Sequence, residues 1–138
     1  MTDSLTPAAR SQRMGMVRGK NTKPELAVRR VVHGMGFRYA LHRRDLPGCP
    51  DLVFAPRKKV IFVHGCFWHR HANSRCRLAR LPKSRLKFWL PKLESNHRRD
   101  QKNIRALKSL GWKILLVWEC QLVNKEQLQN KLRRFLES

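Results

Sequence analysis

The sequence predicts an α/β fold: a single domain of three layers, in which a central mixed β-sheet is flanked by helices. Helical and extended patterns of apolar residues alternate along the chain in the order helix, strands, helix, strand, helix. Residues 113–118 are almost continuously apolar, which is typical of a strand covered on both faces. A length of 138 residues fits one domain with a core, and a hydrophobic content of 41% excludes a wholly disordered chain.

The first element is a helix that begins after Thr22. Residues 22–25 read Thr-Lys-Pro-Glu, which is a capping box with a proline in the first turn. We expect the helix to end at Gly34 and Gly36, because glycine disfavours helix continuation. Its apolar positions recur at helical spacing and are Leu26, Val28, Val31 and Val32.

Short strands are expected next, over residues 37–41, 51–54 and 60–63. The turn-rich residues 46–50, Leu-Pro-Gly-Cys-Pro, lead into the second of these strands. Residues 56–59 make a tight connection between the second and the third. Two strands joined by so short a connection are expected to be neighbours in the sheet.

The second half of the chain is expected to be mainly helical. Residues 72–93 predict a loop with a short helical segment, because Pro91 and a second proline interrupt them. A long helix is then expected from Asn96 to Gly111, and a last helix from about residue 125, with Asn124 as its cap. Their apolar faces are formed by Ile104, Leu107 and Leu110, and by Leu128, Leu132 and Phe135.

Charge is the strongest compositional signal for a partner. The chain has 31 Lys and Arg against nine Asp and Glu, a net charge of +22. Nucleic acid is the simplest partner, because each basic contact to a phosphate releases condensed counterions. A basic surface that associates with a membrane or a ribosome is the alternative. No apolar run approaches the ~20 residues of a membrane span, so a membrane protein is not expected.

The N-terminal segment differs from the rest of the chain. We predict that residues 1–20 form a basic, flexible arm that could order on DNA, and that residues 21–138 form the folded domain. The arm lacks the apolar segment of a signal peptide, so a cytoplasmic location is expected, where disulfides are rare. The arm residues expected to contact DNA are Arg13, Met14, Arg18 and Lys20.

A possible metal centre is formed by cysteines and a histidine. Cys66, His71 and Cys76 lie close together in the sequence, and Cys120 follows the strand predicted at residues 113–118. Four such ligands can complete a tetrahedral zinc site, which would be structural because no position stays open. The alternative is that Cys66 and Cys120 are ordinary buried thiols.

A second constellation combines Asp51 with His64 and His69. Neighbouring strands would bring Asp51 to the same sheet edge as the end of the strand at residues 60–63. A carboxylate and a backbone carbonyl there can hold Mg²⁺, and a nearby histidine can move a proton to or from a phosphodiester. The alternative is an aspartate that only caps the turn after Pro50. The remaining histidines are expected to be solvated or to face phosphate: His33, His42 and His97.

Two pairs of adjacent aromatic residues, Phe67-Trp68 and Phe88-Trp89, lie within basic or metal-binding sequence. Phe67 and Trp68 cannot both point into a core, so we expect at least one to face outward. Exposed aromatic rings on a basic surface can stack on bases or enter a base step. The alternative is packing against the neighbouring loop.

These segments together resemble the very-short-patch repair (Vsr) DNA mismatch endonucleases. The resemblance extends over about residues 10–138 and is most specific in the run His-Gly-Cys-Phe-Trp-His. It rests on Leu46-Pro47-Gly48-x-Pro50-Asp51, His64-Gly65-Cys66-Phe67-Trp68-His69-x-His71, Phe88-Trp89-Leu90, Asn96-x-x-Arg99-Asp100, Gly111-Trp112 and Val117-Trp118-Glu119-Cys120. It implies a type II restriction-endonuclease-like fold, and nicking of DNA 5′ to the thymine of a T:G mismatch that arises from 5-methylcytosine deamination.

The resemblance also implies roles for single residues. Asp51 would be the catalytic carboxylate that binds Mg²⁺, together with the main-chain carbonyl of Val63, which stands where threonine is common in the family. His69 would be the general base on water, and His64 would act on the phosphate or the leaving group.

The remaining implied roles concern support, zinc and DNA. Glu25 and Asp100 would support the active site, and the role of Glu25 competes with its place in the capping box. The implied ligands of structural Zn²⁺ are Cys66, His71, Cys76 and Cys120. The implied wedge beside the mismatch consists of Phe67, Trp68 and Trp89.

The expected partner is therefore double-stranded DNA with a T:G mismatch, bound by a monomer associated with the nucleoid. Functional links to mismatch-repair proteins and to a cytosine-5 DNA methyltransferase are also expected from the resemblance. Two alternatives stay open: a same-fold nicking or homing-type endonuclease without mismatch specificity, and a zinc-stabilised DNA-binding module without catalysis.

Overall fold

A mixed sheet of four strands forms the centre of the computed structural model, in the order β1-β2-β3-β4. The strands are β1 (Ala40–Leu41), β2 (Leu52–Phe54), β3 (Lys59–His64) and β4 (Lys113–Trp118). β2 pairs antiparallel with both β1 and β3, whereas β3 pairs parallel with β4 over six residue pairs. The central strand β3 is therefore paired along both of its edges.

The structure describes residues 22–69, 71, 76, 78 and 85–138. The predicted arm at residues 1–20 lies outside these residues, and so do its predicted DNA contacts Arg13, Met14, Arg18 and Lys20.

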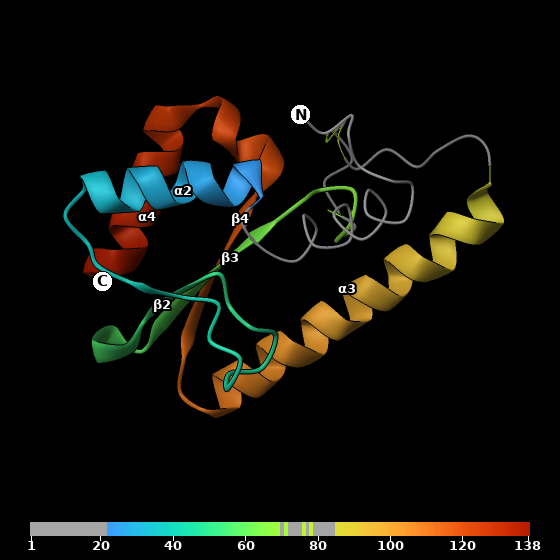
Figure 1. The fold of residues 1–138 in the computed structure, drawn as a ribbon, viewed down its shortest axis with the longest axis horizontal. Coiled ribbons are helices and arrows are strands. Elements are labelled where there is room, and N and C mark those ends of the chain that lie inside the picture. The colour runs from blue at the N-terminus through green and yellow to red at the C-terminus, as the bar shows by residue number, and fades with distance from the viewer. Residues whose placement is uncertain (1–21, 70, 72–75, 77, 79–84) are drawn as a thin grey trace, which may run out of the picture.

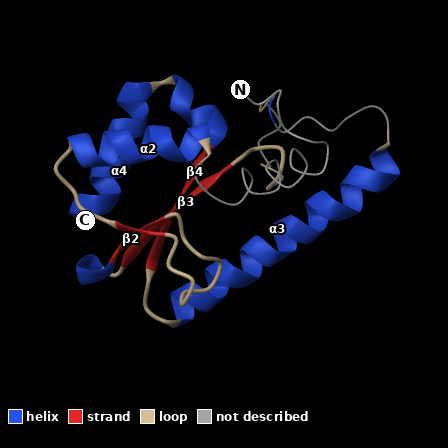
Figure 2. Ribbon diagram, viewed as in Figure 1, coloured by secondary structure: helices blue, strands red, loops and turns tan. Residues whose placement is uncertain are grey.

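Helices cover both faces of the sheet, as the sequence predicts. α2 (Lys23–Gly34) and α4 (Lys125–Glu137) lie together on one side, and α3 (Leu86–Ser109) lies on the other (Figures 1 and 2). Two short 3₁₀ segments, Ala55–Arg57 and Glu119–Val123, follow β2 and β4. Among the described residues, none of the helices is both long and apolar enough to cross a bilayer.

Alternating strand residues build one core on each face of the sheet. The core under α2 and α4 contains the fully buried Ile61 and Val117 of the sheet. Its helical members are Val28, Val32, Leu128, Leu132 and Leu136. The core under α3 contains the intervening strand residues Val53, Val60 and Phe62, packed with Leu107. This alternation makes the domain three layers thick.

The start of α2 follows the predicted cap. The Thr22 side chain accepts a hydrogen bond from the Glu25 N–H at 3.3 Å, and Pro24 lies in the first turn. The Glu25 carboxylate, however, is engaged by His42 and Arg29. The capping function of Thr22 and a site role for Glu25 are therefore compatible.

The prediction for the start of α3 is wrong by ten residues. The helix begins at Leu86 rather than at Asn96, so residues 86–93 are helical and Pro91 lies inside the helix. Proline removes one backbone hydrogen bond there, but packing compensates for the loss. Leu93 is fully buried, and the Trp89 ring contacts the rings of two aromatic residues that follow β3. The local breaker signal is thus overridden by tertiary contacts.

The first strand is also shorter than predicted, since Ala40–Leu41 replaces the expected residues 37–41. Phe37 and Tyr39 instead pack against the core under α2 and α4. The Tyr39 ring meets Phe54 edge-on at 6.1 Å, and its hydroxyl donates to the Arg29 carbonyl at 3.4 Å. These side chains hold the segment without extended pairing.

A buried lysine fixes the end of α4 to the sheet. Lys59 is only 3% exposed, and its Nζ donates to the carbonyls of Phe135 and Ser138, each at 2.7 Å. Arg57 Nη1 donates to the Leu136 carbonyl at 2.9 Å. Two cations therefore satisfy the terminal carbonyls of α4, where the helix dipole is negative.

We predict that Leu132→Ala lowers the free energy of unfolding by about 2–5 kcal/mol, because it opens a cavity in the core under α2 and α4. The matched variant Leu110→Ala removes a side chain that is 53% exposed and should cost about 0.5 kcal/mol or less. Urea denaturation followed by circular dichroism measures both values. Equal losses in the two variants would contradict the packing described here.

Candidate active site and metal centre

Groups of potential ligands gather where β3 ends. Within each group, one ligand atom per residue lies within 4.8 Å of the others. Among the described residues, the groups are Glu25, His42 and Asp51; His64, His69 and Asp100; and Cys66, His71, Cys76 and Cys120. Each group joins residues that are distant in sequence, so each exists only in the folded chain.

The Asp51 carboxylate is anchored to β3. It directly precedes β2 and accepts a hydrogen bond from the Val63 N–H at 2.7 Å. In an antiparallel pair, the N–H and C=O of one residue point toward the same neighbouring strand. Continuing the register of β2 and β3 places Val63 opposite Pro50, which has no N–H to donate to the Val63 carbonyl. The sheet edge therefore presents a carboxylate and a main-chain oxygen side by side.

Glu25 and His42 complete this group. Glu25 comes from α2 and is 1% exposed. The His42 Nε2 lies 2.8 Å from a Glu25 carboxylate oxygen and 3.9 Å from an Asp51 carboxylate oxygen, and Arg29 forms an ion pair with Glu25. The position of His42 corrects the prediction that it is solvated or faces phosphate. Its φ of 49° turns the chain directly after β1, which no local sequence signal indicates.

The burial of Asp51 next to a second carboxylate, Glu25, raises the pKa of Asp51. Burial raises the pKa of Asp51 to about 8, and the charge of Glu25 raises it as well. The hydrogen bond from Val63 and the charge of Arg29 act in the opposite direction. A bound cation would stabilise the ionised form of Asp51. The oxygen donors at this edge are the kind that Mg²⁺ takes in proteins, so the residues fit that ion.

The second group contains a paired histidine and carboxylate. His69 Nδ1 lies 2.5 Å from an Asp100 carboxylate oxygen, which links the turn after β3 to α3. This bond orients the His69 ring and stabilises a proton on Nδ1, so the other nitrogen of a neutral ring is free to accept one. The structure therefore brings together His69 and Asp100, which are separated by 31 positions.

His64 lies against His69. The two imidazole rings are stacked with centroids 3.9 Å apart, and the edge of His64 meets Trp118 of β4. Burial and, to a lesser extent, the charge of the neighbouring His69 lower the pKa of His64 to about 3. The ring is consequently neutral and suited to hydrogen bonding rather than to charge.

The third group brings together the four predicted zinc ligands. The Cys120 N–H donates to the Cys66 sulfur at 3.4 Å, and the Cys120 Sγ lies 3.5 Å from His71 Nδ1. The His71 ring stacks on Trp118 at 4.2 Å. Burial raises the pKa of Cys66 to about 12, so this sulfur needs a cation to become a thiolate. Three sulfurs and one imidazole within this distance fit a four-coordinate zinc ion.

The aromatic residues form a connected cluster between β3 and α3. The rings of Phe67, Trp68 and Trp89 meet edge-on, with centroids 5.1 to 5.8 Å apart. All three are half-buried, and Asn96 donates to the Trp68 carbonyl at 3.1 Å. Phe88 is 42% exposed and lies under the cations of neighbouring basic residues. The cluster is thus held in place by α3 while part of its surface stays accessible.

A hollow of about 310 Å³ lies between His69 of the second group and Trp68 of the aromatic cluster. Its walls come from the start of α2, the end of β3 and the turn beyond it, and from the residue after β4. The lining residues are Thr22, Lys23, Pro24, Val63, Gly65, Trp68, His69 and Glu119. Val63, which is bonded to Asp51, and His69, which is bonded to Asp100, therefore face the same space.

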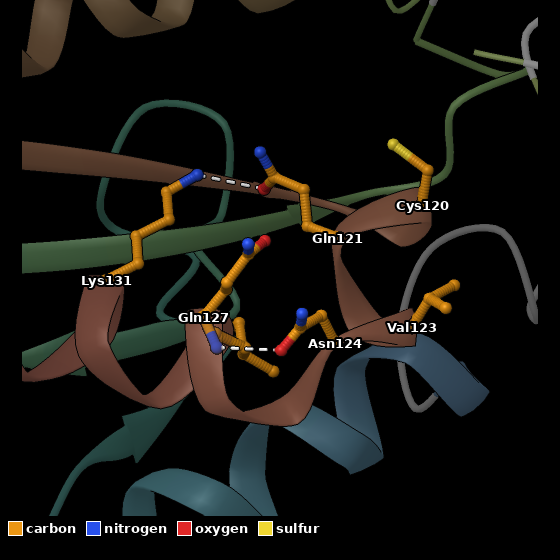
Figure 3. A pocket seen from close by; sticks show the side chains of 7 residues that line it. Cys120, Gln121, Val123, Asn124, Gln127 and Lys131 are labelled. Carbon is orange, nitrogen blue, oxygen red and sulfur yellow. Dashed lines mark hydrogen bonds between the residues drawn. The ribbon is translucent and has the colours of Figure 1, made fainter.

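Another hollow, of about 270 Å³, lies between the segment after β4 and α4 (Figure 3). Lys131 donates to the side chain of Gln121 and to the Leu116 carbonyl, each at 2.9 Å. The Asn124 side chain caps α4 by accepting from the Gln127 N–H at 3.1 Å. The polar groups here tie α4 to β4, so this hollow has a structural explanation.

A family model described as "DNA mismatch endonuclease Vsr" matches residues 2–75 of the chain. The chain is 51% identical to the type II nicking enzyme V.XorIIP of Xanthomonas oryzae pv. oryzae, over 99% of this chain and 98% of that protein. It is 41% identical to the type II nicking enzyme V.NmeAIP of Neisseria meningitidis, over 99% and 95% of the two chains. It is 38% identical to the DNA mismatch endonuclease Vsr of Escherichia coli, over 95% of this chain and 82% of that protein.

Proposed function

The chain belongs to the Vsr family of DNA mismatch endonucleases, and we propose on this basis that it nicks one strand of a duplex 5′ to the thymine of a T:G mismatch. The match to this family and the similarity to nicking enzymes identify the chain as a DNA endonuclease. We also propose that the chain recognises the mismatch, that it depends on Mg²⁺ and that single residues have the roles given below. A restriction-endonuclease-like fold is part of the same proposal.

One observation supports the proposal most strongly. Val63 and His69 line one hollow, and each is bonded to a carboxylate that the resemblance places in the active site. A phosphodiester that entered this hollow would meet a cation-binding edge and a proton acceptor together. This is the combination that hydrolysis of a phosphodiester requires.

The chain's own groups have separate tasks in the proposed reaction. The Asp51 carboxylate and the Val63 carbonyl would hold Mg²⁺, which would supply positive charge against the charge that develops on the phosphate. His69, oriented by Asp100, takes a proton from the attacking water. His64 is neutral and donates a hydrogen bond to a phosphate or leaving oxygen. Glu25 supports Asp51 from α2.

Zinc has a structural role in the proposal. The residues that would hold it are Cys66, His71, Cys76 and Cys120. They connect the turn after β3 to the end of β4, close to His69 and to the aromatic cluster. Four protein ligands leave no open position for water, so the ion would hold shape rather than react.

The aromatic cluster supports a role in finding the lesion. Phe67, Trp68 and Trp89 are half-buried and lie beside the proposed reaction centre, where Trp68 lines the same hollow as His69. Their rings would enter the base step next to the mismatch, which costs least where pairing is already weak. The chain's charge of +22 would supply the phosphate contacts that hold the duplex.

We extend the proposal to the cellular setting. The enzyme would act as a monomer at the nucleoid, with its N-terminal arm on the duplex. It would repair products of a cytosine-5 DNA methyltransferase in concert with mismatch-repair proteins.

An alternative is nicking without mismatch specificity. Two of the relatives are called type II nicking enzymes, and these names state no mismatch. The residues near the phosphodiester would be the same in both cases, so the substrate decides between the two functions.

We predict that a duplex with one T:G mismatch is nicked faster than the matched T:A duplex of the same sequence, by at least about 100-fold, because distortion at the mismatch eases entry of the aromatic cluster. Gel analysis of end-labelled strands in Mg²⁺ measures both rates and locates the nick. Equal rates would favour the alternative function.

We predict that Asp51→Asn lowers the nicking rate by at least about 100-fold, because the variant loses the charge that binds the cation. DNA affinity should stay within about tenfold, since phosphate contacts dominate binding. The matched control is Asp45→Asn, which removes a carboxylate that pairs with Arg43 on the surface and should leave the rate unchanged. Undiminished nicking by Asp51→Asn would remove Asp51 from its assigned role.

We predict about one zinc per chain in the purified protein, and loss of this zinc in Cys120→Ser, because three ligands hold the ion less tightly than four. Cys49→Ser is the matched control, since Cys49 lies outside the four-residue group and the variant should keep its zinc. Elemental analysis by mass spectrometry gives the content, and thermal melts report the stability. A wild-type protein without zinc would contradict the proposed structural role.

A further inference from the structure

The His64 ring carries a buried nitrogen that needs a partner. His64 is 4% exposed, and among the described residues its Nδ1 has no hydrogen-bond partner within the protein. An unsatisfied buried nitrogen costs about 1–3 kcal/mol, so such groups are normally bonded to protein or to ordered water. His64 is also one of the residues that the proposed reaction uses, which makes its protonation pattern functionally relevant.

The ring lines a small niche between β3 and α3. The niche is formed by Phe62, His64, Asp100, Asn103 and Ile104, and its volume is about 10 Å³. This is close to the smallest space that holds one water molecule. Three of the five lining side chains are polar, and a buried water needs two to four polar partners. The niche therefore meets both the size and the polarity that an ordered water requires.

One arrangement of such a water satisfies all three polar side chains, with the Asn103 amide as the donor. The Asp100 carboxylate, already paired with His69, offers only acceptor oxygens. The amide of Asn103 can donate a hydrogen bond. Its Cβ and Nδ2 lie 3.0 and 3.2 Å from the point that a Cβ at Gly48 would occupy, so Asn103 packs closely against this glycine. The loop before Asp51 thus holds Asn103 in place. A water that accepts from Asn103 has its two protons left for Asp100 and for His64 Nδ1.

We propose that Asn103 is a positioning residue which, through one buried water shared with Asp100, keeps the proton of His64 on Nε2. This inference rests on the proposed function, in which His64 acts on the phosphodiester. With the proton on Nε2, the ring offers an N–H to a phosphate oxygen. With the proton on Nδ1, it would offer a lone pair to an oxygen that also carries lone pairs, and the contact would be repulsive.

The tautomer can be measured directly in the free protein. A long-range ¹H–¹⁵N correlation spectrum of histidine-labelled protein at neutral pH distinguishes a protonated from an unprotonated ring nitrogen. We expect His64 to carry its proton on Nε2 in the wild type. In Asn103→Leu, whose side chain has the same branched shape but no amide, we expect the Nε2–H form no longer to predominate.

Kinetics provide a second readout. Asn103→Leu should lower the single-turnover nicking rate by about tenfold, because a group that orients a reacting residue typically contributes that much. Its affinity for the T:G duplex should stay within about twofold of wild type, since phosphate contacts carry binding. The matched control is Asn130→Leu on the exposed surface of α4, which should change neither quantity.

Asn103→Ser separates positioning from packing. Serine is smaller than leucine but has a hydroxyl donor, and the space it leaves admits a further water. Positioning predicts that this variant regains the Nε2–H form and most of the rate. Packing alone predicts that Asn103→Ser stays impaired, because serine leaves a cavity beside Gly48.

The inference is overturned if wild-type His64 carries its proton on Nδ1, or if Asn103→Leu leaves the tautomer unchanged. A wild-type protein that does not nick T:G duplexes in Mg²⁺ would instead contradict the proposed function. The spectrum of the free protein is independent of nicking, so the two failures are distinguishable.

Discussion

The parallel pairing of β3 with β4 is the interaction on which the rest of the site depends. It aligns His64 with Trp118, so that the residues following both strands emerge at the same end of the sheet. Cys120 thereby reaches Cys66, and the turn that carries His69 is held close to the sheet. Antiparallel pairing on the other edge of β3 brings Asp51 to Val63. One strand therefore positions the groups proposed for cation binding, proton transfer and zinc.

Charge is distributed unevenly between the chain as a whole and this end of the sheet. Most of the chain is basic, with a net charge of +22, yet Glu25 and Asp51 are buried together in the domain. Two carboxylates that share a buried place are costly without a cation, and His42 and Arg29 compensate them only in part. A basic chain suited to DNA thus encloses a pair of buried carboxylates, which is the kind of site proposed to hold a metal ion. This contrast favours hydrolysis of a polyanion over simple binding.

Features encoded close together in the sequence were predictable, and features that depend on distant contacts were less so. The Thr22 cap and the alternating strand residues follow from local patterns. Three of the four predicted zinc ligands are close in sequence, and the structure brings the distant Cys120 to them. The pairing of His69 with Asp100 could be expected only from the resemblance, because α3 supplies Asp100 from 31 positions away. No local signal predicted the position of His42, which depends on its left-handed backbone conformation. The burial of Lys59 was equally unpredictable, because it depends on contacts with the distant end of α4. The start of α3 was missed because packing of Leu93 and Trp89 outweighs Pro91.

The central claim is that the sheet edge at Asp51 and Val63 binds the catalytic metal ion. Anomalous diffraction from crystals grown with Mn²⁺ in place of Mg²⁺, together with a T:G duplex, tests this claim most directly. The account predicts an Mn²⁺ peak in contact with both the Asp51 carboxylate and the Val63 carbonyl, next to the scissile phosphate and separate from the sulfur-ligated zinc. Mn²⁺ bound elsewhere on the complex, with this edge occupied only by protein hydrogen bonds, would contradict it.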